Sequence, residues 1–133
     1  AIAKELNVSI DEITSFYSST EDIFLEAQKK DWESLHRYWD KYIKQSSTPG
    51  DYKNAFEIFF ERFVDTLSMD ADLRLELSCY LPECVKYRER NRKRVKQKFN
   101  KLIKKGWPGK DVKVLDRQTE LVTVLFYGFI DHI

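Results

Sequence analysis

Glycine, proline and cysteine are scarce in this chain of 133 residues, which contains four, three and two of them, respectively. So few turn-forming residues argue against an all-β protein with many tight turns. Two cysteines, Cys79 and Cys84, are too few for the disulfide framework of a small secreted protein. No apolar run reaches the roughly 18 residues that a membrane helix needs, and no signal peptide precedes the first predicted helix. These absences favour a cytoplasmic protein with one domain-sized core.

Positive charge is concentrated in one segment, although the net charge is only +1. Between Lys86 and Lys105 there are eleven basic residues and one acidic residue, Glu89, so the rest of the chain is acidic. Three interpretations of this segment stay open. It is a nucleic-acid-binding patch, one wall of a pocket for an anionic ligand, or a solvated surface that balances acidic neighbours.

Apolar periodicity and helix-ending residues divide the chain into helices. A short helix is predicted at residues 2–6, and Ser9 opens a second one, with Glu12 completing a capping box. Longer helices are predicted at residues 19–44, 52–67, 70–81, 83–105 and 115–133. Residues 46–50 are the clearest loop, and Gly106 to Gly109 ends the basic helix.

The first 24 residues carry a specific pattern. They read IAKELNVS at residues 2–9, FYSS at 16–19 and EDIF at 21–24. This order resembles the tetracycline-repressor (TetR) family, in which an Ile-Ala helix, a tight turn ending in Val-Ser, a recognition helix, an aromatic pair and the entry to a long helix follow one another. The resemblance implies a helix-turn-helix in which Val8 and Ile13 pack the two helices together, while Phe16 and Tyr17 anchor the second helix to the body.

The resemblance further implies that the second helix reads an operator in double-stranded DNA. The predicted DNA-contacting residues are Ser9, Ile10, Asp11, Glu12, Thr14, Ser15 and Tyr17. Of these, Tyr17 is expected near a phosphate. Residues 1–22 nevertheless contain one basic and five acidic side chains. That balance opposes phosphate binding, because affinity for DNA comes largely from neutralising phosphates.

The later elements are also similar in order to the family. A long helix ends at Lys105, Asp116 is expected at the entry to the next helix, and that final helix is apolar. In the family, this helix lines a ligand cavity and packs against a partner subunit. The implied dimer contacts are Leu121, Leu125 and Phe129. The family has a further helix at each end that is missing here, so we expect this sequence to be a fragment.

A ligand site is expected inside the helical bundle. Arg88 and Arg92 share one helical stripe with apolar residues of the basic helix, which turns two guanidinium groups inward and favours an anionic, otherwise apolar ligand. Aromatic residues between 52 and 63 are expected to form core, and some of them also to line the cavity. Trp32, Trp39 and Tyr42 share that ambiguity. The predicted ligand-binding residues are Phe56, Phe59, Phe60, Phe63, Arg88, Arg92 and Val95.

No motif favours an enzyme or a metal site. The chain has neither a phosphate-cradling glycine loop nor a Gly-x-Ser-x-Gly or His-Glu-x-x-His motif. His36 and His132 are isolated, without other ligands at metal-binding spacing. Cys79 and Cys84 are expected to be buried, unreactive thiols.

The sequence therefore predicts an all-α, TetR-like protein. Residues 1–22 form a partial helix-turn-helix DNA-binding region, and residues 23–133 form a helical ligand-binding and dimerisation domain. The predicted function is that of a ligand-responsive repressor of transcription, a homodimer that uses no cofactor. The alternative is a helical ligand-binding or protein-interaction module that keeps the scaffold and does not bind DNA.

Overall fold

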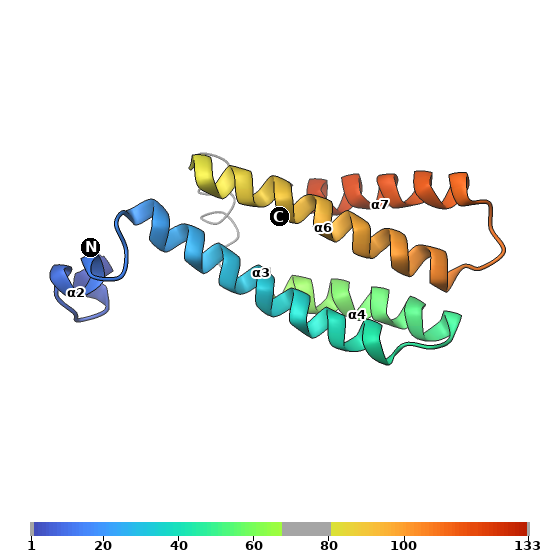
Figure 1. Ribbon diagram of the computed structural model, residues 1–133, viewed down its shortest axis with the longest axis horizontal. Helices are drawn as coiled ribbons and strands as arrows, with labels where there is room; N and C mark the ends of the chain where they lie inside the picture. The colour runs from blue at the N-terminus through green and yellow to red at the C-terminus, as the bar shows by residue number, and fades with distance from the viewer. Residues whose placement is uncertain (1, 68–80, 133) are drawn as a thin grey trace.

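A computed structural model of the chain describes residues 2–67 and 81–132, where all regular secondary structure is helical (Figure 1). This confirms the all-α prediction for these residues. The helices are α1 (Ile2–Glu5), α2 (Ile10–Thr14), α3 (Thr20–Gln45), α4 (Pro49–Leu67), α6 (Pro82–Gly106) and α7 (Val112–His132). The helix predicted at residues 70–81 falls almost entirely outside the described residues. Within the described residues, no helix combines the length and apolar character needed to span a membrane.

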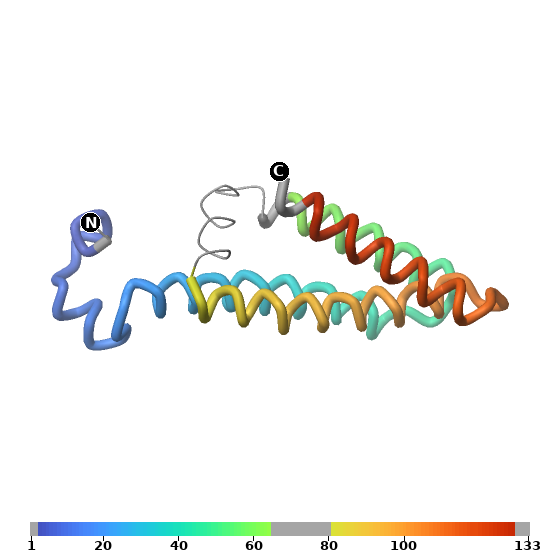
Figure 2. The backbone as a smooth tube through the Cα atoms, turned by 90° about the horizontal axis from the view of Figure 1, so that it is seen from above, coloured from blue at the N-terminus to red at the C-terminus, as the bar shows by residue number. Residues whose placement is uncertain are grey.

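The four long helices form a bundle of two layers. Helices α3 and α6 lie side by side and run in the same direction, while α4 and α7 run back in the other layer (Figure 2). The short helices α1 and α2 lie beyond the bundle, at the N-terminal end of α3 (Figures 1 and 2). The predicted DNA-binding region is thus held away from the bundle core and joined to it through α3.

Aromatic rings fill the centre of the bundle. Trp39 of α3, Phe59 of α4, Phe99 of α6 and Phe126 of α7 are all buried. The rings of Trp39 and Phe59 are stacked with centroids 3.9 Å apart, and those of Phe99 and Phe126 meet edge to face at 5.4 Å. Burial of each large apolar side chain stabilises the fold by about 1.5–3 kcal/mol. Each long helix therefore contributes a ring to one shared core.

Helix α4 begins earlier than predicted, because the loop before it is a helix cap. Pro49 and Gly50, expected in a loop, form the first turn of α4. The Thr48 hydroxyl accepts the Asp51 N–H at 3.2 Å, and the Asp51 carboxylate accepts the Thr48 N–H at 2.8 Å. Proline also suits the first helical position, where its missing N–H costs nothing.

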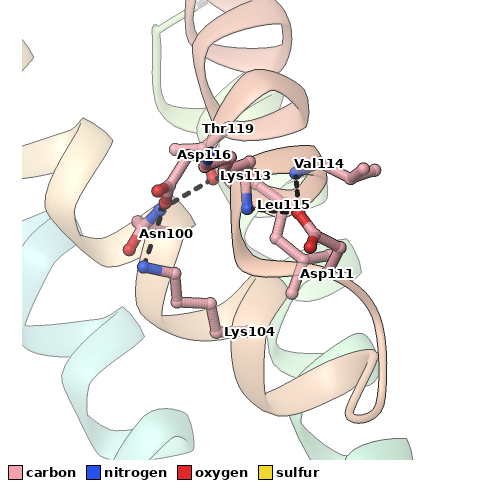
Figure 3. Close-up of polar contacts among 8 residues, drawn as sticks. All are labelled: Asn100, Lys104, Asp111, Lys113, Val114, Leu115, Asp116 and Thr119. Atoms are coloured by element: carbon pink, nitrogen blue, oxygen red, sulfur yellow. Dashed lines mark hydrogen bonds and ion pairs between the residues drawn. The ribbon is translucent and has the colours of Figure 1, made fainter.

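Helix α7 also begins before its predicted start at residue 115. The Asp111 carboxylate accepts the N–H groups of Lys113 at 2.8 Å and Val114 at 3.3 Å, so the helix begins at Val112 (Figure 3). The prediction that Asp116 marks the helix entry is therefore wrong. Asp116 instead accepts a hydrogen bond from Asn100 at 2.9 Å, and its ion pair with Lys104 at 3.0 Å also joins α7 to α6.

Candidate functional site

Helices α1 and α2 form a small two-helix unit whose connecting turn is held by the backbone. Asn7 adopts a positive φ of 54°, and the Asn7 and Val8 N–H groups donate to carbonyls of α1. Ser9 then caps α2, because its Oγ accepts the Glu12 N–H at 3.1 Å while the Glu12 carboxylate accepts the Ser9 N–H at 2.9 Å. The predicted capping box is confirmed, and it fixes the start of α2.

The residues predicted to contact DNA lie on the outside of this unit. Tyr17 is half-buried, and the others are exposed: Ser9, Ile10, Asp11, Glu12, Thr14 and Ser15. Several of their polar groups are engaged within α2, since the Thr14 and Ser15 hydroxyls donate to α2 carbonyls and Glu12 closes the capping box. Ile10 and Asp11 are therefore the side chains best placed to meet a partner.

Phe16 does not anchor α2 to the body, so this part of the sequence prediction is wrong. Its side chain is 84% exposed, and Val8, expected to pack between the two helices, is also exposed. Tyr17 faces α3 instead. It helps to line an open pocket of about 610 Å³ together with Asp22, Leu25 and Lys29. Phe16 also lines this pocket, although most of its side chain is exposed, and both aromatic residues follow α2, which ends at Thr14.

The apolar residues predicted to bind a ligand are part of the packed core. Phe59, Phe63 and Val95 are almost completely buried, and Phe56 and Phe60 are half-buried against the same cluster. Their rings contact one another and rings of α6 and α7. Trp39, also ambiguous from the sequence, is fully buried there. Contact between these residues and a ligand stays a prediction.

The predicted inward orientation of the two arginines of α6 is confirmed. Arg88 and Arg92 are half-buried, and the guanidinium carbons lie 5.9 Å and 5.2 Å, respectively, from the centroid of the Tyr127 ring. Val95 and Phe99, on the same stripe of α6, are fully buried. The two guanidinium groups therefore lie at the edge of the core, over an aromatic ring of α7.

A buried polar cluster joins α3 to α6 beside these arginines. His36 Nε2 lies 2.8 Å from Asn91 Oδ1, and Lys98 Nζ lies 2.9 Å from His36 Nδ1. Lys98 also forms an ion pair with Asp40 at 2.6 Å. His36 and Asn91 are both buried. This cluster could not be predicted from the sequence, because its partners are more than fifty residues apart along the chain. The one available signal was a histidine within the apolar stripe that contains Trp39.

The surroundings of His36 keep its ring neutral. The Lys98 ammonium can only donate, so Nδ1 is the acceptor and Nε2–H donates to Asn91. Burial lowers the pKa of His36 from 6.5 to about 4, and the nearby Lys98 charge acts in the same direction. A proton on Nδ1 would remove the Lys98 hydrogen bond and place two cations in contact. The cluster therefore serves as a neutral polar link between the helices at pH 7.

Two buried polar groups remain near the arginines. Neither Asn91 Nδ2 nor the Tyr127 hydroxyl makes a hydrogen bond of normal geometry among the described residues, but the Asn91 side chain lies close enough to the Tyr127 hydroxyl to act on its pKa. Burial also raises the pKa of Tyr127 well above its ordinary range, so its hydroxyl is a neutral donor. Leaving such a group unpaired costs about 1–3 kcal/mol. The Arg92 guanidinium carbon lies 5.2 Å from the centroid of the Tyr127 ring, so these polar groups share one edge of the core.

One face of α7 is apolar and exposed. The predicted dimer contacts Leu121, Leu125 and Phe129 are between 55% and 62% exposed, and Val114 and Val124 are exposed as well. Helical periodicity places these residues on the side opposite the core-facing side of α7. A contiguous apolar patch of this kind commonly marks a protein interface.

The one cysteine that the structure describes fits the prediction for it. Cys84 is buried, and burial raises the pKa of its thiol, which makes it a poor nucleophile. Cys79 lies outside the described residues. Among those residues, no group of three His, Cys, Asp or Glu side chains is placed to hold a metal ion.

Replacing His36 with glutamine is expected to change how stability depends on pH. The folded-state pKa lies below the unfolded value, so between about pH 6.5 and 4 the unfolded chain binds the extra proton. Wild-type stability should then fall with decreasing pH by up to about 1.4 kcal/mol per pH unit from this residue. Urea unfolding of wild type and His36→Gln across pH 4–8 measures the difference. If the free energies of unfolding of the two proteins ran parallel against pH, the burial of His36 would be contradicted. The range near pH 8, where His36 is neutral in both the folded and the unfolded chain, is the internal control.

No protein-family model, curated protein or solved structure matches the chain. Its function has therefore to be argued from the surfaces and clusters described above.

Proposed function

We propose that the chain is a DNA-binding transcriptional regulator of the tetracycline-repressor type, a homodimer that responds to a small anionic ligand. The observation that carries this proposal is the placement of α1 and α2. They project from the N-terminal end of α3, with Ile10 and Asp11 turned outward, where a DNA groove can reach them. Base-edge contacts of this kind provide the sequence specificity of DNA-binding proteins.

The exposed face of α7 supports the homodimer. Leu121 and Leu125 are one helical turn apart at its centre, and Phe129 continues the row. A second copy packed on this face would bury the same residues from both chains, as a two-fold symmetric interface does. Two copies of α2 would then be held at a fixed separation, which a two-part operator requires.

The polar cluster supports a connection between ligand and DNA. A carboxylate held by Arg92, Asn91 and Tyr127 would contact α6 and α7 at once. Asn91 is already bonded to His36 of α3, and α3 carries the α1–α2 unit. A ligand that binds one arrangement of these helices more tightly than another would shift the population between them, and with it the affinity for DNA.

The acidic character of residues 1–22 favours the second candidate function. One basic side chain against five acidic ones gives this unit no phosphate-binding surface of its own. A helical module that binds a small ligand or another protein through the same surfaces, without DNA, accounts for this feature. The two candidates differ in whether the folded dimer selects a DNA sequence.

Selection from a pool of random duplexes tests the regulator directly. We expect the wild-type protein to enrich one sequence, and the double variant Ile10→Ala/Asp11→Ala to bind that sequence about 10-fold or more weakly, because each lost base contact costs about 1–3 kcal/mol. Glu57→Gln, an exposed change on α4, is the matched control. Failure of the folded wild-type dimer to enrich any sequence would favour the second candidate.

The double variant Leu121→Glu/Leu125→Glu is expected to be monomeric, because burying two carboxylates in the interface costs far more than the lost apolar contact. Sedimentation velocity on wild type and variant measures the change in mass. Val112→Glu places one such carboxylate on an exposed residue off the apolar face of α7 and should leave the dimer intact. A dimeric double variant would refute the assignment of this face.

Decanoate is expected to raise the melting temperature more than decanol of the same chain length, since only the carboxylate can pair with Arg92. A ligand at 100 times its Kd stabilises a protein by about 2.7 kcal/mol. Arg92→Gln should remove the advantage of decanoate, whereas Lys113→Gln, an exposed change on α7, should keep it. Equal shifts with acid and alcohol would exclude a carboxylate site at Arg92.

A further inference from the structure

Helix α6 carries exposed cations that no acidic side chain balances. Its ion pairs with other helices engage Arg94, Lys96, Lys98 and Lys104. Four further cations are exposed and have no ion-pair partner among the described residues: Lys105, which lies over the Tyr52 ring of α4, and a row made of Arg90, Lys93 and Lys101. A solvated surface that balances acidic neighbours therefore explains only those cations of the basic segment that form ion pairs.

Helix α3 carries a matching row. Four exposed cations recur along it at intervals of seven, four and three residues, which places them on one helical stripe: Lys30, Arg37, Lys41 and Lys44. None of them has an ion-pair partner in the part of the chain that the structure describes. At 1.5 Å per residue, this row extends for about 21 Å.

The two rows lie on the same side of the molecule. The seam between α3 and α6 is fixed by the contact of His36 with Asn91 and by the ion pair of Asp40 with Lys98. Arg37 follows His36 and Arg90 precedes Asn91 in the sequence, so each lies about 100° around its helix from the seam. Helices α4 and α7 pack on the opposite side of the α3–α6 layer (Figure 2). The outer side of this layer is thus a broad, straight, positively charged face.

Two acidic residues at the seam beside this face are already paired with cations of α6. At the seam, Glu33 pairs with Arg94, and Asp40 pairs with Lys98. The seven cations of the two rows form no ion pair among the described residues, although exposed Glu26 lies one turn before Lys30 and the charge of Arg90 helps to lower the pKa of Glu83. We call them the α3–α6 basic face.

We propose that the α3–α6 basic face binds the phosphate backbone of duplex nucleic acid. A duplex carries one negative charge per about 1.7 Å of its axis, so a rigid row of cations meets many phosphates at once. The large apolar residues exposed in the described structure lie on α2, α4 and α7 and in the connections on either side of α2 and before α7, and none belongs to the two rows. The face therefore offers no aromatic platform for single-stranded bases and no apolar side chains to enter a membrane.

This inference rests on the proposed function for its choice of partner and adds a division of labour to it. The acidic α1–α2 unit cannot neutralise phosphates, whereas the basic face can. Backbone contacts supply affinity and orientation without sequence information, and base contacts supply selectivity. The two roles are then carried by different helices and can be removed separately.

The test compares two triple variants of the full chain that lose the same charge. Arg37→Gln/Lys41→Gln/Lys101→Gln removes three cations of the basic face, and Lys53→Gln/Lys110→Gln/Lys113→Gln removes three exposed cations elsewhere. Binding to a fluorescent duplex of random sequence is measured from 50 to 200 mM salt, after circular dichroism has established that each variant is folded. Each lost phosphate contact should reduce the slope of log K against log salt by about 0.9.

We expect the face variant to lose about two to three units of slope and at least 10-fold in affinity at 50 mM salt, while the control variant binds like wild type. If the face variant and the wild type have equal slopes of log K against log salt, the inference is overturned, whereas sequence selection by α2 is not. If the face variant has a smaller slope but no sequence is enriched from the random pool, the basic face binds duplex and the proposed sequence-specific regulator fails. The inference would also be overturned if the wild-type protein bound vesicles of phosphatidylserine and phosphatidylcholine but not the duplex, or if it bound neither.

Discussion

The fold depends on the ring of Phe99, which contacts an aromatic ring on each of the other three long helices. It meets Trp39 of α3 at 5.6 Å, Phe59 of α4 at 5.5 Å and Phe126 of α7 at 5.4 Å between centroids. Since this one side chain is fully buried from all sides, none of the four helices can shift without disturbing the others. The surfaces of the bundle are consequently held in fixed relation to one another.

The polar seam between α3 and α6 adds specificity to this packing. Apolar rings tolerate small sliding movements, but His36 and Asn91 lose a buried hydrogen bond if either helix moves by one residue. The ion pair of Lys98 with Asp40 fixes the same register one turn further along. This seam holds the two rows of cations at a constant spacing, and it also connects the Asn91–Tyr127 group to the helix that carries α1 and α2.

Local features were predictable from the sequence, and distant contacts were not. The Ser9–Glu12 capping box and the inward turn of Arg92 depend on spacings of three or four residues, so periodicity sufficed. His36 looked isolated because its partner Asn91 is 55 residues away. The exposure of Phe16 was missed for a different reason: aromatic residues are normally buried, but α2 is too short to turn it inward. The start of α4 at Pro49 needed the carboxylate of Asp51 to be recognised as a cap.

Acidic and basic residues are separated along the chain: the α1–α2 unit is acidic, and the outer face of α3 and α6 is basic. An acidic α1–α2 unit approaching a duplex alone would be repelled by its phosphates, and Asp11 could reach a cytosine amino group only if cations nearby held the backbone. The bundle carries such cations on a face that its core keeps rigid. If the bundle binds the phosphates as proposed, its affinity would permit the acidic unit to discriminate between sequences, since a weakly attracted unit stays bound only where its base contacts are correct. In the proposed regulator, repulsion in α2 and attraction along α3 and α6 would thus be two parts of one recognition scheme.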